Sequence, residues 1–390
     1  MTISQLPDDA GHALLPAGLQ DGLPPEAAHE AATMERLIDA LAAHGYERVK
    51  PPLLEFEDSL LIGPGEQVAT QTFRLMDPIS QRMMGLRADM TPQVARIASS
   101  RLSRAPRPLR LCYAGEVLRV RGNQLRPERQ FAQVGAELVG ALAPAADAEL
   151  VRLAAEALQS IGIKNLSVDL SLPTLVGGLF SELQIPESAR RPLRAALDRK
   201  DAAAVKQAAG DQALLFDALL RAAGLVDRAL PMLKKLSLPA EAQLLIDELA
   251  EVVEQLRREA PELRLTVDPV EHRGYEYQTG LSFTLFARGV RGELGRGGRY
   301  AAVAGDGHEE PAAGFTLFMD TVLRALPAAR RGNRCYLPFG SDPELGRALR
   351  ASGWITLAGL EPEQNAVEEA RRLNCSHLLQ DGEASKLENM

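Results

Sequence analysis

The chain has 390 residues and a formal net charge of −8, from 44 basic and 52 acidic residues. This length allows two or more domains and a large core, and the contents of 46% hydrophobic and 25% charged residues are those of a globular protein. An acidic chain has no overall attraction for nucleic acid or for an anionic membrane surface. No run of about 18 apolar residues is present, which excludes a membrane-spanning helix.

The N-terminus lacks a basic start and an apolar stretch, so we predict no secretory signal. The three cysteines, Cys112, Cys335 and Cys375, are far apart and odd in number, which favours reduced thiols over disulfides or a zinc site. The six histidines are scattered as well. We therefore expect a cytoplasmic protein with no metal site and no cofactor.

The first elements are a loop and a long helix. Residues 1–25 are rich in Pro and Gly, and apolar residues at helical spacing predict a helix over 26–43. An extended segment follows at 46–54, interrupted by Pro51 and Pro52. A long helix that leads into a strand marked by proline is typical of a dimer interface.

Residues 66–87 predict a short hairpin that turns at Asp77. A helix is then expected to begin at Pro92, and Thr91 is a suitable cap for it. Capping explains Thr91 completely, whereas Asp89, just before the cap, has no evident structural role.

An antiparallel hairpin is predicted from strands at 111–121 and 131–139. One face of the second strand is apolar. The other face would form a surface that carries Arg119, Gln133 and Glu137. A guanidinium, an amide and a carboxylate on one face could hold a small zwitterion, but an ordinary solvated sheet face is the commoner explanation of this pattern.

Arginine is concentrated around this hairpin. Residues 71–130 contain twelve Arg, no Lys and four acidic residues, which gives a local charge of +8. Arginine suits carboxylate or phosphate recognition because its planar fork binds anions bidentately. Arginine also outnumbers lysine elsewhere in the chain, so a compositional preference explains the surplus equally well.

A helix is predicted at 144–161 and a strand at 165–171, followed by an almost wholly helical stretch, rich in Ala and Leu, at 173–260. We interpret that stretch as a helical subdomain inserted into a sheet domain. Its apolar stripes are typical of a core.

Strands are expected again from Leu263. The glycine-rich segment 289–299 lacks the pattern of a phosphate-binding loop, and a tight hairpin turn is the better explanation. Residues 312–326 predict a strand and then a helix, and 333–388 alternate strand and helix as a small α/β unit.

Taken together, these segments resemble histidyl-tRNA synthetase, a class II aminoacyl-tRNA synthetase. The helix at 26–43 resembles the first motif of that family, and the hairpin resembles the second. The strings that carry the resemblance are RQFAQVGAE at 129–137, HRGYEYQTG at 272–280 and GGRY at 297–300.

The resemblance implies an α+β fold of the class II synthetase type, with a mixed, mainly antiparallel sheet flanked by helices. The synthetase-like domain would span 1–326, with the helical insertion at about 173–260. Residues 333–390 would form a reduced unit like an anticodon-binding domain.

The resemblance also implies a histidine site. Asp89, Thr91 and Gln133 would hold the amino group, and Glu137 would meet the imidazole. Two tyrosines would line the slot, and two arginines would face the carboxylate; these are Tyr277, Tyr300, Arg119 and Arg273.

Two departures from the synthetase motifs concern ATP. The acidic residue that orients adenine in the second motif is replaced by Arg121, and the arginine that clamps ATP in the third motif is replaced by Thr321. The loss of one such contact typically costs roughly 3 kcal/mol of transition-state stabilisation, about 10²–10³ in rate. A third change places Gln278 where the family has tyrosine. Aminoacylation is therefore not expected, and no catalytic residue is assigned.

A paralogue group of the synthetase has this combination: the regulatory subunits of ATP phosphoribosyltransferase, the first enzyme of histidine biosynthesis. The string LRADMTPQVARIAS at 86–99 resembles that group. The resemblance implies a regulatory subunit without catalysis of its own. It would form a dimer, assemble with a short-form catalytic subunit as a hetero-octamer, and bind L-histidine for feedback regulation.

Three alternatives remain at this point. The chain could be an active histidyl-tRNA synthetase that tolerates Thr321, or a ligase that activates histidine for another acceptor. Both would need ATP. An RNA-binding paralogue that uses the arginine-rich segment is the third, and the acidic balance disfavours it.

Overall fold

The computed structural model describes residues 14–122, 126–272, 278–303, 307–329 and 332–387. The chain divides into two compact units, of which one comprises 1–22 and 30–327 and the other 23–29 and 328–390. No helix within the described residues has the length and apolar content needed to cross a membrane.

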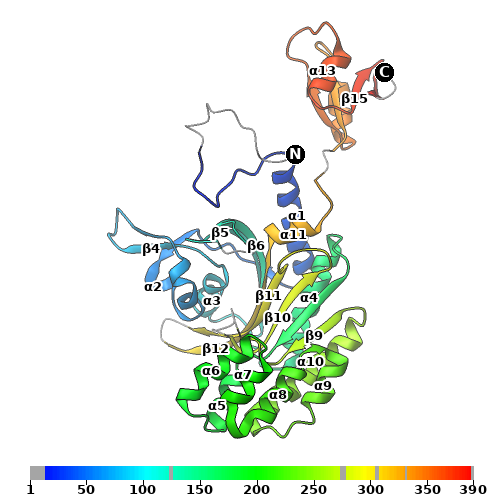
Figure 1. Cartoon of the computed structure of the whole chain (residues 1–390). Coiled ribbons are helices and arrows are strands. Elements are labelled where there is room, and N and C mark those ends of the chain that lie inside the picture. Colours follow the sequence, from blue (N-terminus) through cyan, green and yellow to red (C-terminus); the bar gives the residue numbers. More distant parts are fainter. Residues whose placement is uncertain (1–13, 123–125, 273–277, 304–306, 330–331, 388–390) are drawn as a thin grey trace. The chain divides into compact units, whose positions relative to one another are not determined.

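The framework of the first unit is a sheet of nine strands within the described residues, in the order β1-β5-β6-β12-β11-β10-β7-β9-β8 (Figure 1). The strands are β1 (Glu47–Arg48), β5 (Leu109–Leu118), β6 (Gln130–Val139), β7 (Leu166–Ser171), β8 (Gly224–Leu225), β9 (Arg264–Asp268), β10 (Gln278–Ala287), β11 (Gly295–Val303) and β12 (Glu309–Phe318). Only β1 with β5 and β7 with β9 pair in parallel. The predicted mixed, mainly antiparallel sheet is confirmed.

Strands β5 and β6 form the predicted hairpin, paired without interruption from Leu109↔Val139 to Leu118↔Gln130. The alternative explanation of its polar face, an ordinary solvated sheet face, is wrong. Gln133 is 0% and Glu137 is 1% exposed, because helix α3 (Thr91–Ser99) and its preceding turn pack over that face. The polar residues of β6 are therefore buried and must find partners inside the protein.

Helices cover the sheet where the apolar periodicity predicts them. They include α1 (Glu26–Ala42), α4 (Pro144–Ser160) and α11 (Met319–Ala325). Leu37, Ile38 and Leu41 form the buried stripe of α1, as their helical spacing indicates. Helix α4 packs on β10, β11 and β12, and this places its first turn behind the strands that carry the predicted site.

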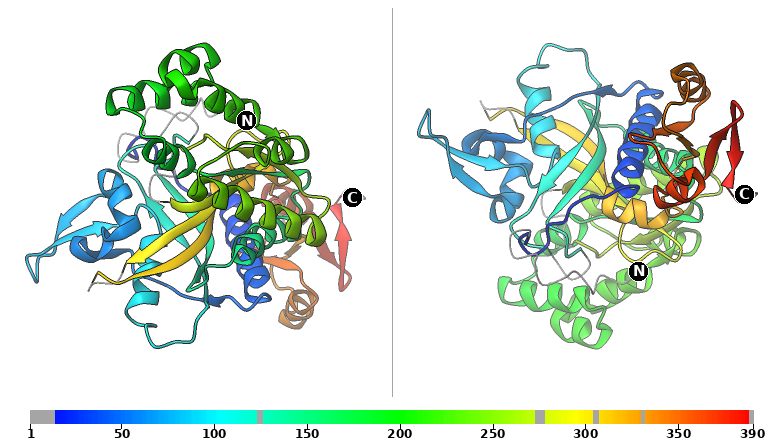
Figure 2. Two further views of the ribbon diagram at one scale, coloured as in Figure 1. Left: turned by 90° about the horizontal axis from the view of Figure 1, so that it is seen from below. Right: turned by 90° about the horizontal axis from the view of Figure 1, so that it is seen from above.

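The stretch predicted as helical contains a bundle that Figure 2 shows gathered at one end of the unit, in green. Its elements are α5 (Leu175–Glu182), α6 (Glu187–Asp198), α7 (Ala202–Ala209), the 3₁₀ turn η2 (Gly210–Gln212), α8 (Ala213–Arg221), α9 (Val226–Leu233) and α10 (Ala240–Glu259). Leu193 and Phe216 of the bundle belong to the same apolar cluster as Val168 of β7. The insertion thus shares one continuous core with the sheet.

A second, three-stranded sheet consists of β2 (Leu54–Phe56), β3 (Arg74–Met76) and β4 (Met83–Leu86), preceded by α2 (Glu57–Leu60). Strands β3 and β4 form the predicted hairpin, which projects from the unit in both views of Figure 2. The start of the hairpin was predicted at residue 66, but Gly63–Gln71 forms a 3₁₀ helix, η1. Pro64 favours this start, because its ring fixes φ and its missing N–H is not needed in the first turn.

The glycine-rich segment holds the predicted turn, at 288–294, but its second half is strand β11. A Cβ atom at Gly297 would lie 2.4 Å from the carbonyl oxygen of Gly314 and 2.5 Å from the ring of Phe283. Glycine is required here by close packing between neighbouring strands rather than by turn geometry.

The second unit has the predicted alternation of strands and helices, with one further strand at the end. Its sheet has the order β14-β13-β15-β16. The elements are β13 (Arg334–Leu337), α12 (Pro343–Ala351), β14 (Ile355–Ala358), α13 (Ala366–Arg372), β15 (His377–Gln380) and β16 (Glu383–Lys386).

Candidate functional site

Six of the eight predicted site residues are described by the structure; Arg273 and Tyr277 lie outside the described residues. Four of the six line one narrow cavity of about 30 Å³. These are Asp89, Thr91, Glu137 and Tyr300. The cavity lies on the sheet face that α3 covers, so its walls are a helix start and strands β6, β11 and β12.

Asp89 and Gln133 form the end of the cavity next to α3. The Asp89 Oδ1 atom accepts the Thr91 N–H at 3.0 Å, and its Oδ2 atom accepts from Gln133 Nε2 at 3.1 Å. The Met90 N–H donates in turn to Gln133 Oε1 at 3.1 Å. Gln133 is thus buried beneath Asp89 and fixes its carboxylate.

The prediction that Thr91 caps α3 is therefore wrong. Thr91 is the first residue of the helix and makes no capping hydrogen bond. The Asp89 carboxylate instead satisfies a free N–H at the helix start, a position that also favours negative charge. Asp89 has the structural role that the sequence left unassigned, and the Thr91 side chain is free to face the cavity.

Glu137 forms the other end of the cavity. Its Oε2 atom accepts from the Tyr300 hydroxyl at 2.9 Å, and its Oε1 atom accepts from the Tyr113 hydroxyl at 3.2 Å. Burial raises the pKa of Glu137 to about 8; the hydrogen bonds from Tyr300, Thr91 and Tyr113 oppose that rise, whereas the charge of Asp89 adds to it. The raised pKa favours the protonated form of this carboxyl at neutral pH.

Tyr113 was not predicted as a site residue, although it lies on the same strand face as the predicted polar residues. Its hydroxyl lies 3.2 Å from Thr91 Oγ1 and 2.8 Å from Thr316 Oγ1, in addition to Glu137. The ring passes over Gly135, where a Cβ atom would lie 2.4 Å from it. The period-two pattern around Gly135 is the feature of the sequence that could have identified Tyr113 as a site residue.

Gly314 of β12 is a second residue that the sequence did not identify. It pairs with Glu137 on one side and with Gly298 on the other, so β12 runs between the strands of Glu137 and Tyr300. A Cβ atom on Gly314 would lie 1.7 Å from Glu137 Oε2. The absence of a side chain at this position is what lets the carboxylate reach across β12 to Tyr300 Oη.

Arg119 follows β5 and lies beside Asp89 rather than in the cavity wall. Its Nε atom donates to the Ala88 carbonyl oxygen at 3.2 Å, and its Nη2 atom is 3.8 Å from Asp89 Oδ2. Burial lowers the pKa of Arg119; Asp89 raises it, and the nearby Arg296 and Arg126 lower it further.

Gln278 and Arg296 line the cavity without having been predicted for it. The Gln278 Oε1 atom is buried and accepts no hydrogen bond, so the cavity contains an acceptor that is open to a donor from a ligand. Gln278 was noted in the sequence only as a departure from the synthetase.

Thr321, which stands where the third motif of the synthetase has the arginine that clamps ATP, is surrounded by the protein's own side chains. Thr321 is buried, and its hydroxyl accepts from Arg324 Nη2 at 3.0 Å. Arg126 pairs with Asp320 Oδ2 at 2.8 Å and places its guanidinium 3.9 Å from the ring centre of Phe318 and 4.9 Å from that of Phe131. The aromatic surface at this end of β6 is thus covered by a cation.

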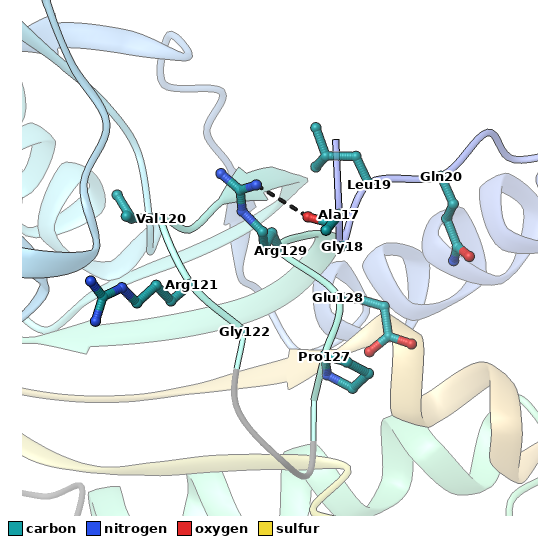
Figure 3. A pocket seen from close by; sticks show the side chains of 10 residues that line it. All are labelled: Ala17, Gly18, Leu19, Gln20, Val120, Arg121, Gly122, Pro127, Glu128 and Arg129. Carbon is teal, nitrogen blue, oxygen red and sulfur yellow. Dashed lines mark hydrogen bonds between the residues drawn. The ribbon is translucent and has the colours of Figure 1, made fainter. Parts of the chain in front are cut away.

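A larger, open groove of about 740 Å³ lies between the segment Ala17–Gln20 and the two limbs of the loop after β5, at 120–122 and 127–129 (Figure 3). Arg129 Nη1 donates to the Ala17 carbonyl oxygen at 3.1 Å, the dashed line in the figure. The exposed Arg121 is one of its lining residues. None of the six described residues that were predicted for the histidine site lines this groove, so we treat it as a separate feature.

The sheet topology, the covered hairpin and this cavity define a protein of the histidyl-tRNA synthetase class. The family model described as histidyl-tRNA synthetase matches residues 18–322. A Bacillus halodurans protein described as an ATP phosphoribosyltransferase regulatory subunit/histidyl-tRNA synthetase superimposes with a TM-score of 0.79 at 23% identity, over 92% of this chain and 96% of that chain. Histidyl-tRNA synthetase from Nostoc superimposes with a TM-score of 0.77 at 20% identity, over 94% of this chain and 91% of that chain. Similarity at this level confirms the predicted fold.

Curated relatives decide between the members of this class. The chain is 54% identical to the ATP phosphoribosyltransferase regulatory subunit of Rhodospirillum centenum, over 97% of both chains. It is also 54% identical to the regulatory subunit of Paramagnetospirillum magneticum, over 95% of this chain and 97% of the relative. This chain belongs to the family of ATP phosphoribosyltransferase regulatory subunits. The prediction of a regulatory subunit without catalysis of its own is confirmed.

Proposed function

We propose that the cavity binds free L-histidine and that the chain transmits this binding to a short-form ATP phosphoribosyltransferase catalytic subunit in a hetero-octamer. The observation that carries this proposal is the fully buried carboxyl of Glu137, which faces Tyr300 across Gly314. A protein buries an ionisable group of this kind at a cost in stability, and such groups cluster at functional sites.

The cavity offers complementary groups for each part of the ligand. The fixed Asp89 carboxylate would accept the α-amino group, and Arg119 beside it would meet the α-carboxylate. Glu137 would meet the imidazole, whose N–H could also donate to Gln278 Oε1. Thr91 and Gln133 complete the amino-group end, and Arg273 and Tyr277 remain predictions for the carboxylate and the slot.

The covered aromatic surface supports binding of histidine without ATP. Arg126 occupies the face of Phe318 where a planar base could otherwise stack, and its pairing with Asp320 holds it there.

Histidine can regulate the partner only if its affinity differs between two states of the assembly. We propose that a dimer of this chain, built around α1 and the strand after it, is part of that assembly. The chain would work in the cytoplasm, where it needs neither nucleic acid nor a membrane.

The test is phosphoribosyl-ATP formation by the cognate catalytic subunit, with and without this chain, and then with histidine. Activity should require both chains and fall when histidine is added. Glu137→Gln should weaken inhibition by histidine while the complex still forms. Glu310→Gln is the matched control, because this carboxylate pairs with Arg107 away from the cavity. Co-elution without any effect on rate, or inhibition unchanged in Glu137→Gln, would contradict the proposal.

A further inference from the structure

The string GGRY supplies Tyr300 to the cavity, but its arginine serves the opposite face of the sheet. Successive side chains of β11 alternate, so Arg299 points toward α4. Its Nε and Nη2 atoms lie 2.9 and 2.7 Å from Asp147 Oδ2, in the first turn of α4. The Asp147 side chain is 5% exposed and that of Arg299 is 12% exposed, so this ion pair is almost wholly inside the protein.

The same guanidinium also binds the loop that follows β6. Its Nη1 atom donates to the Ala141 carbonyl oxygen at 3.2 Å, and its Nη2 atom to the Ala143 carbonyl oxygen at 2.7 Å. Ala141 lies four residues beyond Glu137 on the same strand and its continuation. One side chain on the Tyr300 strand therefore holds the end of the Glu137 strand.

The path of Arg299 is tightly defined. Its side chain crosses Gly280 of β10, where a Cβ atom would lie 2.9 Å from Arg299 Cδ. Burial raises the pKa of Asp147 to about 6, and the charge of Arg299 and its hydrogen bond oppose that rise. A lysine could pair with the carboxylate, but one ammonium lacks the planar fork needed to reach three acceptors from this position.

We propose that Arg299, paired with Asp147, is a positioning residue that fixes the distance between the Tyr300 hydroxyl and the Glu137 carboxyl. Between these two groups runs β12, whose Gly314 contributes no side chain to hold them apart or together. The main-chain ladders on both sides of β12 set the spacing of the strand backbones. Arg299 adds a side-chain link from β11 to the loop that follows β6, and this link restrains the two strands at that end. The value of this separation for histidine sensing rests on the function proposed above, whereas the geometry itself can be tested without ligand.

The experiment titrates Glu137 in the ligand-free full-length protein. The infrared carbonyl stretch of its protonated carboxyl is the signal that monitors the titration. The infrared difference against Glu137→Gln assigns that band in each variant. Tyr300→Phe should raise the pKa of Glu137 above about 8, because the hydrogen bond from Tyr300 lowers it. Arg299→Lys should move the pKa in the same direction, and adding it to Tyr300→Phe should cause no further change.

Arg110→Lys is the matched control. Arg110 makes a bidentate ion pair of 2.8 and 2.8 Å with Glu149, on the same helix, from strand β5. If Arg299 only anchored α4, both lysine variants would leave the Glu137 titration unchanged.

An unchanged Glu137 titration in Arg299→Lys would overturn the inference. So would a shift of the Glu137 pKa in Arg299→Lys that adds in full to the shift caused by Tyr300→Phe. If Arg299→Lys does not fold, Asp147→Asn answers the same question, because it weakens the pair and leaves the arginine in place. Histidine binding by the same proteins is a separate readout. If the wild-type protein binds no histidine, the proposed function is refuted. The effect of Arg299 on the titration of Glu137 would not be altered by that outcome.

Discussion

The two ends of strand β6 lie beside the same neighbouring strand, β12. They differ in whether a cavity remains next to their side chains. At Glu137, β12 contributes Gly314, and the carboxyl reaches across it into a cavity. At Phe131, β12 ends in Phe318, the two rings meet edge to face at 6.1 Å, and Arg126 covers them. One end borders a cavity lined by polar side chains, whereas at the other end an arginine covers the aromatic rings.

This difference shows how a binding region can be closed without loss of the fold. A buried cation needs a partner, and Asp320 supplies one to Arg126 at 2.8 Å. At the open end, the groups that a ligand would meet are held by one another and by main-chain hydrogen bonds. Four predictions test this contrast, from the largest expected effect to the smallest.

Arg126→Ala should destabilise the protein by about 3 kcal/mol, because it leaves the buried Asp320 carboxylate with the more distant Arg324, at 3.6 Å, in place of its partner at 2.8 Å. Histidine affinity should fall less than it does in Glu137→Gln, because Arg126 contacts the cavity-lining Phe318 but does not itself line the cavity. Chemical denaturation and calorimetric titration measure the two effects. The double change Arg126→Met with Asp320→Asn should recover most of the stability; a large loss of affinity in either protein would show that the two ends are coupled.

Glu137 should make stability depend on pH. Its pKa of about 8 in the folded protein lies above the value of the unfolded chain, so its contribution is complete below about pH 4.5 and is lost as pH rises through 8. Glu137→Gln removes this dependence. Between pH 5 and pH 9, wild type should lose on the order of 3 kcal/mol of unfolding free energy relative to the variant. Parallel pH profiles of the two proteins would contradict the buried, protonated state.

Gly314→Ala should cost about 1–3 kcal/mol of stability and abolish high-affinity histidine binding, because the new methyl group displaces the Glu137 carboxylate. Gly178→Ala in α5 is the control, since a Cβ atom there meets nothing closer than 4.0 Å. Thermal unfolding and calorimetric titration report both effects. Unaltered binding in Gly314→Ala would mean that Glu137 need not lie across β12.

Thr316→Val should have the smallest effect, about 1 kcal/mol of stability, through the loss of one hydrogen bond of 2.8 Å to the Tyr113 hydroxyl. Tyr113 keeps its bond to Glu137, so histidine affinity should fall only slightly. A loss as large as that of Gly314→Ala would place Thr316 among the residues that contact the ligand.

Much of the architecture was predictable because it is local. Period-two alternation predicted β5 and β6, and helical periodicity predicted α1, α4 and the helical insertion. The same pattern put Gln133 and Glu137 on one face of one strand, and both lie at the candidate site. The chemical types needed for a zwitterion were visible in the residues themselves.

The sequence by itself thus determined the order of the elements, the family resemblance and most of the polar residues of the cavity. Only the tertiary structure decided that β12 runs between β6 and β11, which makes Gly314 the residue that Glu137 must cross. It also decided that Asp89 rather than Thr91 satisfies the start of α3, and that the polar face of β6 is buried. Periodicity reports which residues share a face, but the strand or helix that covers this face comes from far along the chain. Burial, and with it the raised pKa of Glu137, is therefore a property of long-range packing.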